Sequence, residues 1–413
     1  MHASIPARLL VAAALGLAAA GCRGDKVASP EELTVVPKPP ATMTVLGRGN
    51  FTPARTTAEI AVRGTTAYTT TWGNPAAAAS VFYIWNVAGD QPLLVDSVRV
   101  DNATTLGDVA VTDDGALLVI ATERANGGLA IYSLADPRRP VLVSRYVTPR
   151  TSAGVHTAEV GRVNGRQYAF LSIDQGAEPA RIVIVDLGNP AAPVEVYTKL
   201  IGNPFVHDTF VRDGLLFLAL WDDGVAIWDI GGGNSGGTPA VPVELGRVRT
   251  VNGNVHNVWW LKDPVTNNAR FALIGEESAI PGASSAGDIH VVDIGTRSAP
   301  REVAYYRVPG AGTHNFSVDE ASGILYAAYY NGGVRAIDVR GDLGTCTTAQ
   351  KSQIDNATLL CDLRLMGREL GIGLLDRPAP VQIWGVQYQD GAVYASDMRG
   401  GIWKLKSLVR ASP

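Results

Sequence analysis

Four of the six histidines in the chain begin similar apolar segments, and imidazole is the side chain best suited to hold a metal ion in such a pattern. The four are His156, His207, His256 and His314. A neutral imidazole binds metal through a ring nitrogen, and several imidazoles with open positions suit Fe, Cu, Zn or Ni better than Ca or Mg. We therefore take these four residues as candidate ligands of one transition metal ion.

The elements that would position these histidines repeat along the chain. Each copy of the repeat is an apolar segment with a polar residue near its end, often followed by a proline turn and a second apolar segment. The seven copies lie at residues 83–87, 130–134, 183–187, 226–230, 290–294, 335–339 and 401–405. A period of roughly 40–50 residues with variable insertions is typical of propeller blades.

Two further apolar segments precede each copy, so each unit is predicted to contain four strands, as a propeller blade does. The candidate histidines stand at the start of the first strand in units 3 to 6. The first strand of a blade is its innermost strand and lines the central channel. We therefore expect the four imidazoles to form an arc at one mouth of that channel.

Carboxylates are expected at the same mouth, because the turn between the second and third strands lies beside the start of the first. The candidates for orienting the imidazoles are Glu123, Asp174, Asp222, Glu276 and Asp397. Such carboxylates accept the second ring N–H of a metal-bound histidine. The same turns also contain Asp223 and Glu277, and the aromatic residues expected on this face are Trp72, Trp221, Tyr329 and Trp384.

Three interpretations of the histidines stay open. They bind a metal or another ligand, they hold the blades together through hydrogen bonds, or they share no role. Thr57, Gly107 and Trp384 fall at about the same place in the other three units, whereas a purely structural need would recur in every blade. His290 lies in a third strand and is predicted to be structural.

The number of fourth strands predicts how the ring closes. Six are expected near residues 94–100, 141–147, 193–199, 243–249, 302–308 and 364–370. The seventh unit has only a short polar tail, while residues 43–49 match the fourth-strand pattern. We therefore predict an all-β, seven-bladed propeller with four antiparallel strands per blade, whose last blade is closed by the N-terminal strand. Residues 43–413 would form this single domain, and the pairing of its two ends removes an open sheet edge.

The segment from Ile182 to Val194, with Val183-Ile184-Val185-Asp186-Leu187 at its centre, resembles the LVIVD-repeat family of bacterial exported proteins. The resemblance covers residues 43–406, but Asn86, Ser133 and Lys404 replace the repeat's Asp in three copies. It implies a seven-bladed β-propeller and little about activity, because propellers host many functions.

The first residues have the pattern of an export signal. Arg8 precedes an apolar run over residues 9–20 that is too short to span a bilayer, and residues 1–21 are predicted to be removed. The small residues directly before Cys22 resemble a bacterial lipobox, which implies lipid attachment at Cys22. An ordinary secretory signal is the alternative. Residues 22–42 would then be a flexible tether, and Arg23 favours the outer membrane or cell surface of the envelope.

Cys346 and Cys361 flank an insertion between the third and fourth strands of blade 6. An exported protein lies in an oxidising compartment, so a disulfide is expected. The alternatives are two free thiols or a pair of metal ligands.

Composition excludes some functions and leaves others open. A net charge of −4 argues against nucleic-acid binding, and the chain contains no P-loop. The leading hypothesis is a lipid-anchored binding or scaffold propeller that holds a protein, glycan or other ligand on its axial face. The alternatives are a redox or hydrolytic metalloenzyme that uses the four histidines, and a purely structural envelope protein. The sequence does not decide whether the protein is an enzyme.

Overall fold

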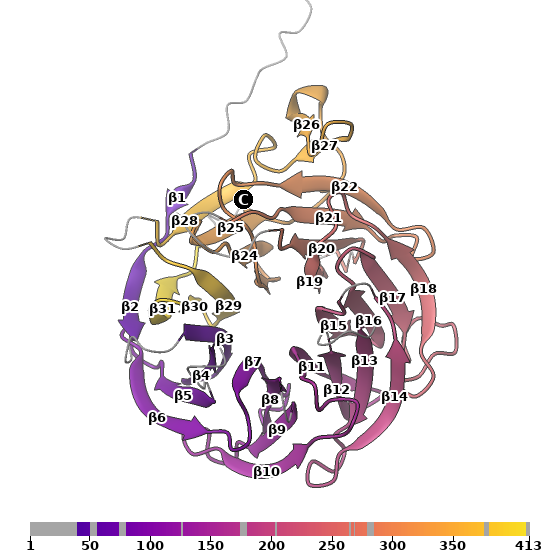
Figure 1. The fold of residues 1–413 in the computed structure, drawn as a ribbon. Coiled ribbons are helices and arrows are strands. Elements are labelled where there is room, and N and C mark those ends of the chain that lie inside the picture. The colour runs from indigo at the N-terminus through magenta and orange to yellow at the C-terminus, as the bar shows by residue number, and fades with distance from the viewer. Residues whose placement is uncertain are drawn as a thin grey trace, which may run out of the picture. The chain divides into compact units, whose positions relative to one another are not determined.

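The computed structural model describes residues 39–49, 56–73, 80–124, 127–173, 180–202, 205–263, 266–267, 269–278, 285–375 and 380–409. Seven antiparallel sheets follow one another around a central axis (Figure 1). These residues contain strands and one short 3₁₀ helix but no α-helix, and so no helix among them could span a membrane. The predicted all-β, seven-bladed propeller is confirmed.

Blades 1 to 4 each contain four consecutive strands, which follow one another from the axis outward. Blade 1 contains β3 (Thr56–Arg63), β4 (Thr66–Trp72), β5 (Val81–Asn86) and β6 (Leu93–Arg99). Blade 2 contains β7 (Thr105–Val111), β8 (Leu117–Glu123), β9 (Gly128–Ser133) and β10 (Val141–Tyr146). Blade 3 contains β11 (Thr157–Val163), β12 (Arg166–Ile173), β13 (Arg181–Asp186) and β14 (Val194–Leu200). Blade 4 contains β15 (Asp208–Arg212), β16 (Leu215–Ala219), β17 (Val225–Asp229) and β18 (Val243–Val248).

Blades 5 and 6 keep this order with extra strands at their outer edges, and blade 7 takes its fourth strand from the N-terminus. Blade 5 contains β19 (Val255–Trp260), β20 (Phe271–Glu276), β21 (Ile289–Asp293) and β22 (Arg301–Tyr306). Blade 6 contains β23 (Phe316–Asp319), β24 (Ile324–Ala328), β25 (Val334–Asp338) and β28 (Glu369–Gly373), with β1 (Ala41–Thr42) added outside. Blade 7 contains β29 (Ile383–Gln389), β30 (Ala392–Asp397), β31 (Gly401–Lys406) and β2 (Val45–Gly49).

The N-terminal strand closes blade 7, as predicted. β2 is antiparallel to β31, with Val45 opposite Leu405 and Gly49 opposite Ile402. Strands from the two ends of the chain therefore lie side by side in one sheet (Figure 1). The pairing of β1 with β28 was not predicted, because residues 41–42 fall within the segment expected to be a tether. Cys22 and the predicted signal lie outside the described residues.

The hydrophobic core lies between neighbouring blades. Every residue of β17 is buried because a blade packs on each of its faces. One such layer joins Phe170 and Ile184 of blade 3 to Leu218 and Trp228 of blade 4. The outermost strands are far more exposed, as in β6. Since no blade can bury both faces alone, the ring is the smallest unit that completes the core.

The Asp that ends the repeat is a turn residue. Asp229 accepts five backbone N–H groups from the glycine-rich turn that follows it, from Gly231, Gly232, Gly233, Ser235 and Gly237. Asp186 accepts one, from Gly188 at 2.8 Å. In blade 7 the Lys404 ammonium donates instead to the carbonyls of Val87 and Gly89 in blade 1. Lys404, which replaces the Asp of the repeat, therefore also forms hydrogen bonds to a turn, here the turn of blade 1.

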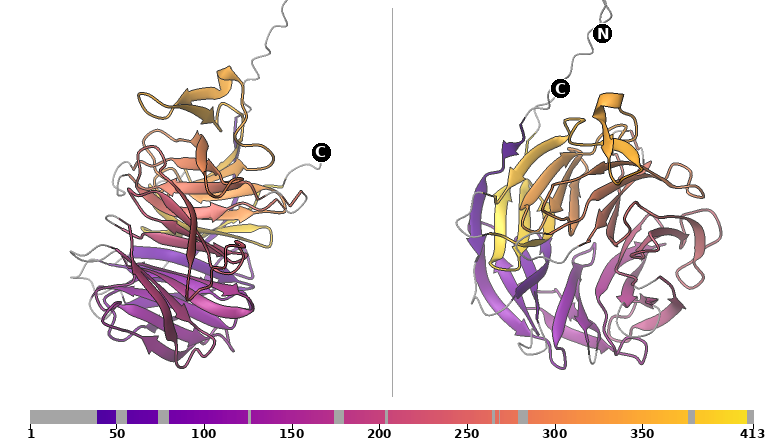
Figure 2. Two further views of the ribbon diagram at one scale, coloured as in Figure 1. Left: turned by 90° about the vertical axis from the view of Figure 1, so that its right-hand side faces the viewer. Right: turned by 45° about the horizontal axis from the view of Figure 1, so that its top comes forward.

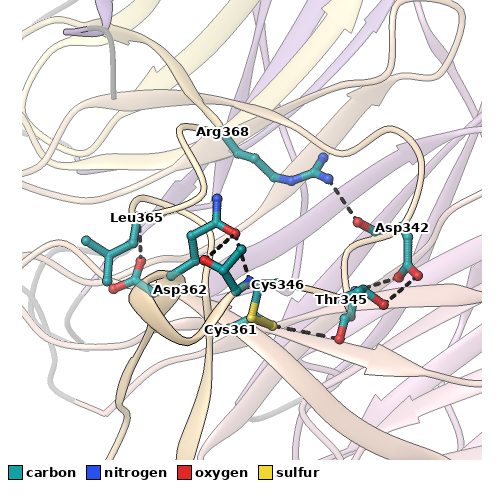
Figure 3. The surroundings of a disulfide bond; sticks show 10 residues. Asp342, Thr345, Cys346, Cys361, Asp362, Leu365 and Arg368 are labelled. Carbon is teal, nitrogen blue, oxygen red and sulfur yellow. Dashed lines mark hydrogen bonds between the residues drawn. A yellow bond between two sulfur atoms is a disulfide. The ribbon is translucent and has the colours of Figure 1, made fainter. Parts of the chain in front are cut away.

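The insertion in blade 6 attaches to its neighbour. It forms the 3₁₀ turn Thr348–Gln350 and the strands β26 (Lys351–Gln353) and β27 (Leu359–Asp362). β27 adds in parallel to β22 of blade 5, and the resulting hairpin lies outside the ring of blades (Figure 2). Cys346 and Cys361 form the expected disulfide, and the Cys361 sulfur lies 3.7 Å from the Gly344 carbonyl oxygen (Figure 3).

The fourth strand of blade 6 begins later than predicted. It spans Glu369–Gly373 rather than residues 364–370. Residues 363–367 form the turn by which the chain returns from β27, so pairing with β25 starts only at Glu369.

Candidate metal centre

Backbone hydrogen bonds place the candidate histidines at one level around the axis. The amides of His156, His207 and His314 donate to the carbonyls of Ser172, Ala219 and Ala328, at the ends of the neighbouring second strands, at 2.8–2.9 Å. His256 lies in β19. The ring centroids follow one another at 4.3, 4.2 and 4.0 Å in the order His156, His207, His256, His314. The structure therefore brings all four imidazoles into one arc.

Two imidazoles and one carboxylate have the spacing of metal ligands, and a third imidazole lies beside one of them. The Nε2 atoms of His156 and His207 are 3.1 Å apart. The Glu277 Oε2 atom lies 3.9 Å from His207 Nε2 and 3.8 Å from His256 Nε2. Ligands about 2.0–2.1 Å from a shared ion are roughly 2.9 Å apart when adjacent in an octahedron and about 4.1 Å apart when opposite. His207, His256 and Glu277 are also the one metal-sized group found among the described residues.

In both His156 and Glu277, the side-chain atom that points away from the other imidazoles has a hydrogen-bond partner. The Nδ1 atom of His156 lies 3.2 Å from Glu123 Oε1, and the same oxygen accepts the indole N–H of Trp72. Because a carboxylate accepts a proton from Nδ1, the lone pair of His156 is on Nε2, which faces His207. The hydroxyl of Tyr330 donates to Glu277 Oε1 and leaves Oε2 toward the imidazoles. This is the arrangement of a carboxylate, a histidine and a metal in series.

His207 and His256 are buried without enough partners of their own. His256 is 3% exposed, and neither ring nitrogen has a hydrogen-bond partner in the structure; His207 Nδ1 lacks one as well. Burial, and then the neighbouring imidazoles, lower the pKa of each of these two residues well below the ordinary value. Both rings are therefore neutral at pH 7, which is the form that binds metal.

His314 has a different role at the end of the arc. Its Nδ1 donates to the Trp384 carbonyl at 2.8 Å, and its ring lies 4.3 Å from the Trp384 ring. Burial lowers its pKa as well. Like His156, it is not in the group whose ligand atoms all lie within 4.8 Å. The structure thus gives this histidine a structural partner that His256 lacks.

Two aromatic residues beside the centre have strained backbones. Trp221 and Tyr330 have φ angles of 52° and 39°, a left-handed conformation that is costly for bulky side chains. They occupy equivalent turns, each bridging to the first strand of the next blade. Trp221 stacks on His207 at 5.1 Å, and Tyr330 lies edge-on to His314 at 5.1 Å. Strain of this kind is typical of functional sites.

Of the predicted orienting carboxylates, Glu123 alone contacts a candidate histidine in the described residues. Asp222 is exposed. Asp397 accepts the backbone N–H of Gln382 and the indole N–H of Trp403. Asp174 lies outside the described residues.

Glu276 contacts His290, at 3.2 Å from its Nε2. The other ring nitrogen of His290 lies 2.7 Å from Glu302. Burial alone would lower the pKa of His290, but its two carboxylate partners raise it to about 10. His290 is therefore a buried cation between two anions, which fits the structural role predicted for it.

The channel beneath the imidazoles is lined by carboxyl groups. A cavity of about 40 Å³ is bounded by the four imidazoles together with Glu59, Asp108, Asp208 and Asn315. The latter four also line a channel cavity of about 620 Å³. Burial raises the pKa of Glu59 and of Asp208 to about 8, and repulsion from Asp108 adds to both shifts.

Glu277 and Tyr330 are site residues that the sequence prediction placed wrongly or left out. The sequence places both carboxylates in this turn but favours Glu276, and not Glu277, as the one that orients an imidazole. Neighbouring residues at a strand end point to opposite sides, so an error of one residue exchanges the two. Tyr330 occupies the repeat position of Trp221, and aligning those two turns would have identified it.

Fold and site together define a seven-bladed propeller with an imidazole cluster at its axis. The model of the LVIVD repeat matches residues 177–199, which include β13 and most of β14. The crystal structure of Saccharomyces cerevisiae Sqt1 is similar in fold, with a TM-score of 0.54 and 8% sequence identity over 88% of this chain and 86% of that chain. No curated protein matches the sequence.

Proposed function

We propose that this protein is an exported propeller, held to the outer membrane by lipid on Cys22, that binds one transition metal ion at its axial mouth. His156, His207 and His256 would bind through Nε2, and Glu277 through Oε2. Three nitrogens and one oxygen suit Fe, Cu, Zn or Ni, and leave positions open on an ion that prefers five or six ligands. A metal with an open position can act as a Lewis acid or in redox chemistry.

The observation that carries this proposal is the environment of His256. A buried polar group without a partner costs about 1–3 kcal/mol, and His256 has two such nitrogens. One of them faces a carboxylate oxygen at 3.8 Å, with a second imidazole beside it. A cation between these groups would satisfy the lone pairs that the protein leaves unpaired.

Metal content of the purified full-length protein tests the proposal. After equilibration with Fe²⁺, Cu²⁺, Zn²⁺ or Ni²⁺ and removal of loosely bound ions, the wild type should retain close to one equivalent of one of them. His207→Ala and Glu277→Gln should lose most of it. Glu123→Gln should bind roughly 10–100-fold more weakly, as expected for a carboxylate behind a ligand.

Asp222→Asn is the matched control, because Asp222 is an exposed carboxylate of an equivalent turn. It should keep wild-type metal content. A wild type that retains no metal, or a Glu277→Gln variant that retains all of it, would refute the metal centre. The leading hypothesis from the sequence, a scaffold that binds a protein or glycan on this face, predicts that outcome.

A further inference from the structure

The metal-binding residues border an internal cavity on one side. His156, His207 and His256 all line the cavity of about 40 Å³, whereas Glu277 is not among its lining residues. An ion held between the imidazoles and Glu277 would therefore have its open position toward this cavity.

The cavity limits the size of any molecule that binds there. A cavity needs about 10–15 Å³ to hold one water molecule, so this cavity holds about three water-sized molecules. Its remaining walls include Asp108, Asp208 and Asn315, which are polar. The space suits a small polar or diatomic molecule and excludes a ring-sized one.

Aromatic residues pack around the imidazoles, and one of them, Trp384, also lines the cavity. Trp221 stacks on His207, and Trp384 packs on His314. Phe205 packs edge-on against Trp221 at 5.1 Å.

A wider path leads away from the imidazoles. The cavity of about 620 Å³ shares Glu59, Asp108, Asp208 and Asn315 with the small one, so the two adjoin there. Its walls continue along the inner strands to Arg162 and Arg212, at the ends of β11 and β15 remote from the histidines. These shared residues form the neck of the path.

We infer that the axial metal binds a water-sized or diatomic molecule, and that this molecule arrives through the central channel from the face opposite the imidazoles. The inference rests on the proposed metal centre and adds the size class of its substrate and its route. The polar neck would pass such a molecule and hold back larger ones.

The test uses the full-length protein in detergent, loaded with Co²⁺, whose visible absorption changes when a ligand binds. The probes are used at pH 8, where cyanide is mostly neutral HCN and imidazole is mostly the neutral ring. Cyanide should change the spectrum of the wild type, and imidazole should not. This comparison requires no variant.

Asn315→Phe would narrow the neck, and should slow the cyanide response about tenfold, a barrier increase of about 1.4 kcal/mol, with cobalt content unchanged. Tyr388→Trp adds bulk to the wide cavity alone and should leave the rate unchanged. Imidazole binding as readily as cyanide, or an unchanged rate in Asn315→Phe, would overturn the inference while the metal centre stands. A wild type that retains neither cobalt nor any of the four metals tested above would overturn both.

Discussion

Replacing His256 by Leu should stabilise the metal-free protein, although His256 is almost completely buried. The two side chains have similar volumes, so the packing changes little. The substitution removes two ring nitrogens that have no hydrogen-bond partner. A histidine retained for structural reasons would behave in the opposite way.

The expected magnitude follows from those two nitrogens. Each unpaired buried group costs about 1–3 kcal/mol, while an imperfect fit of leucine costs up to about 1.5 kcal/mol. At the lower bound, two such groups outweigh the imperfect fit, so the free energy of unfolding of the metal-free variant should exceed that of the wild type by at least about 0.5 kcal/mol. When free metal is at 100 times its dissociation constant, the wild type gains about 2.7 kcal/mol. The variant gains much less, so the order of stability reverses.

The assay is urea unfolding of both proteins, with chelator and with the metal found in the wild type. His314→Leu is the matched control, since His314 is equally buried and stands at the same repeat position. It donates to the Trp384 carbonyl at 2.8 Å, and losing that bond should destabilise the protein by about 1 kcal/mol.

A metal-free His256→Leu protein that is less stable than the wild type would refute the reasoning. It would show that the ring is satisfied in solution. An equal metal-induced gain in both proteins would show that His256 is not a ligand.

Three further predictions concern the fold and the anchor. A chain starting at Asn50 lacks β2, so it should melt well below one starting at Arg23, because both a sheet edge and the flank of blade 7 become exposed; equal melting temperatures would contradict the closure. Cys22→Ser should move the protein from the membrane to the soluble fraction on cell fractionation, and persistent membrane association would point to another anchor. Burial raises the pKa of Asp229, but its backbone donors outweigh burial and lower the pKa to about 2. The ionised Asp229 therefore stabilises the folded protein at pH values above the usual Asp pKa near 3.9, and this stabilisation is lost as the pH falls toward 2. Asp229→Asn should cost about 2 kcal/mol at pH 7, measured by urea unfolding. Asp186→Asn loses an ion pair with Arg166 but keeps an oxygen that can accept its one backbone N–H, so it should cost less.

The fold was predictable because equivalent strands are buried in the same way in every blade, so the same apolar pattern recurs along the sequence. A third strand such as Val225–Asp229 is buried on both faces and therefore apolar throughout, and the Asp at its end accepts the N–H groups of the next turn. Closure by β2 followed from counting fourth strands. The later start of β28 was not predictable, because the insertion forms its own pairing with blade 5.

The histidines were predictable as a group because repeat register places equivalent residues at equivalent heights. Of their partners, Glu123 was predictable in the same way, but Glu277 and Tyr330 were not. Glu276 ends β20 and Glu277 follows it, and since neighbouring side chains point to opposite sides, an error of one position exchanges the two. Tyr330 lies in a turn and has a positive φ angle. Aromatic residues rarely adopt this conformation, so the sequence does not indicate it.

The sequence by itself therefore determined the class of the protein: a ring of seven blades, the strand that closes it, the disulfide, and an arc of four imidazoles. Only the tertiary structure decided how those imidazoles differ. His314 found a backbone acceptor, His156 found Glu123, and His256 was left with neither nitrogen paired. Repeat spacing is a one-dimensional property that fixes height and order around the axis, whereas hydrogen bonds at the axis depend on side chains from several blades converging within a few ångströms.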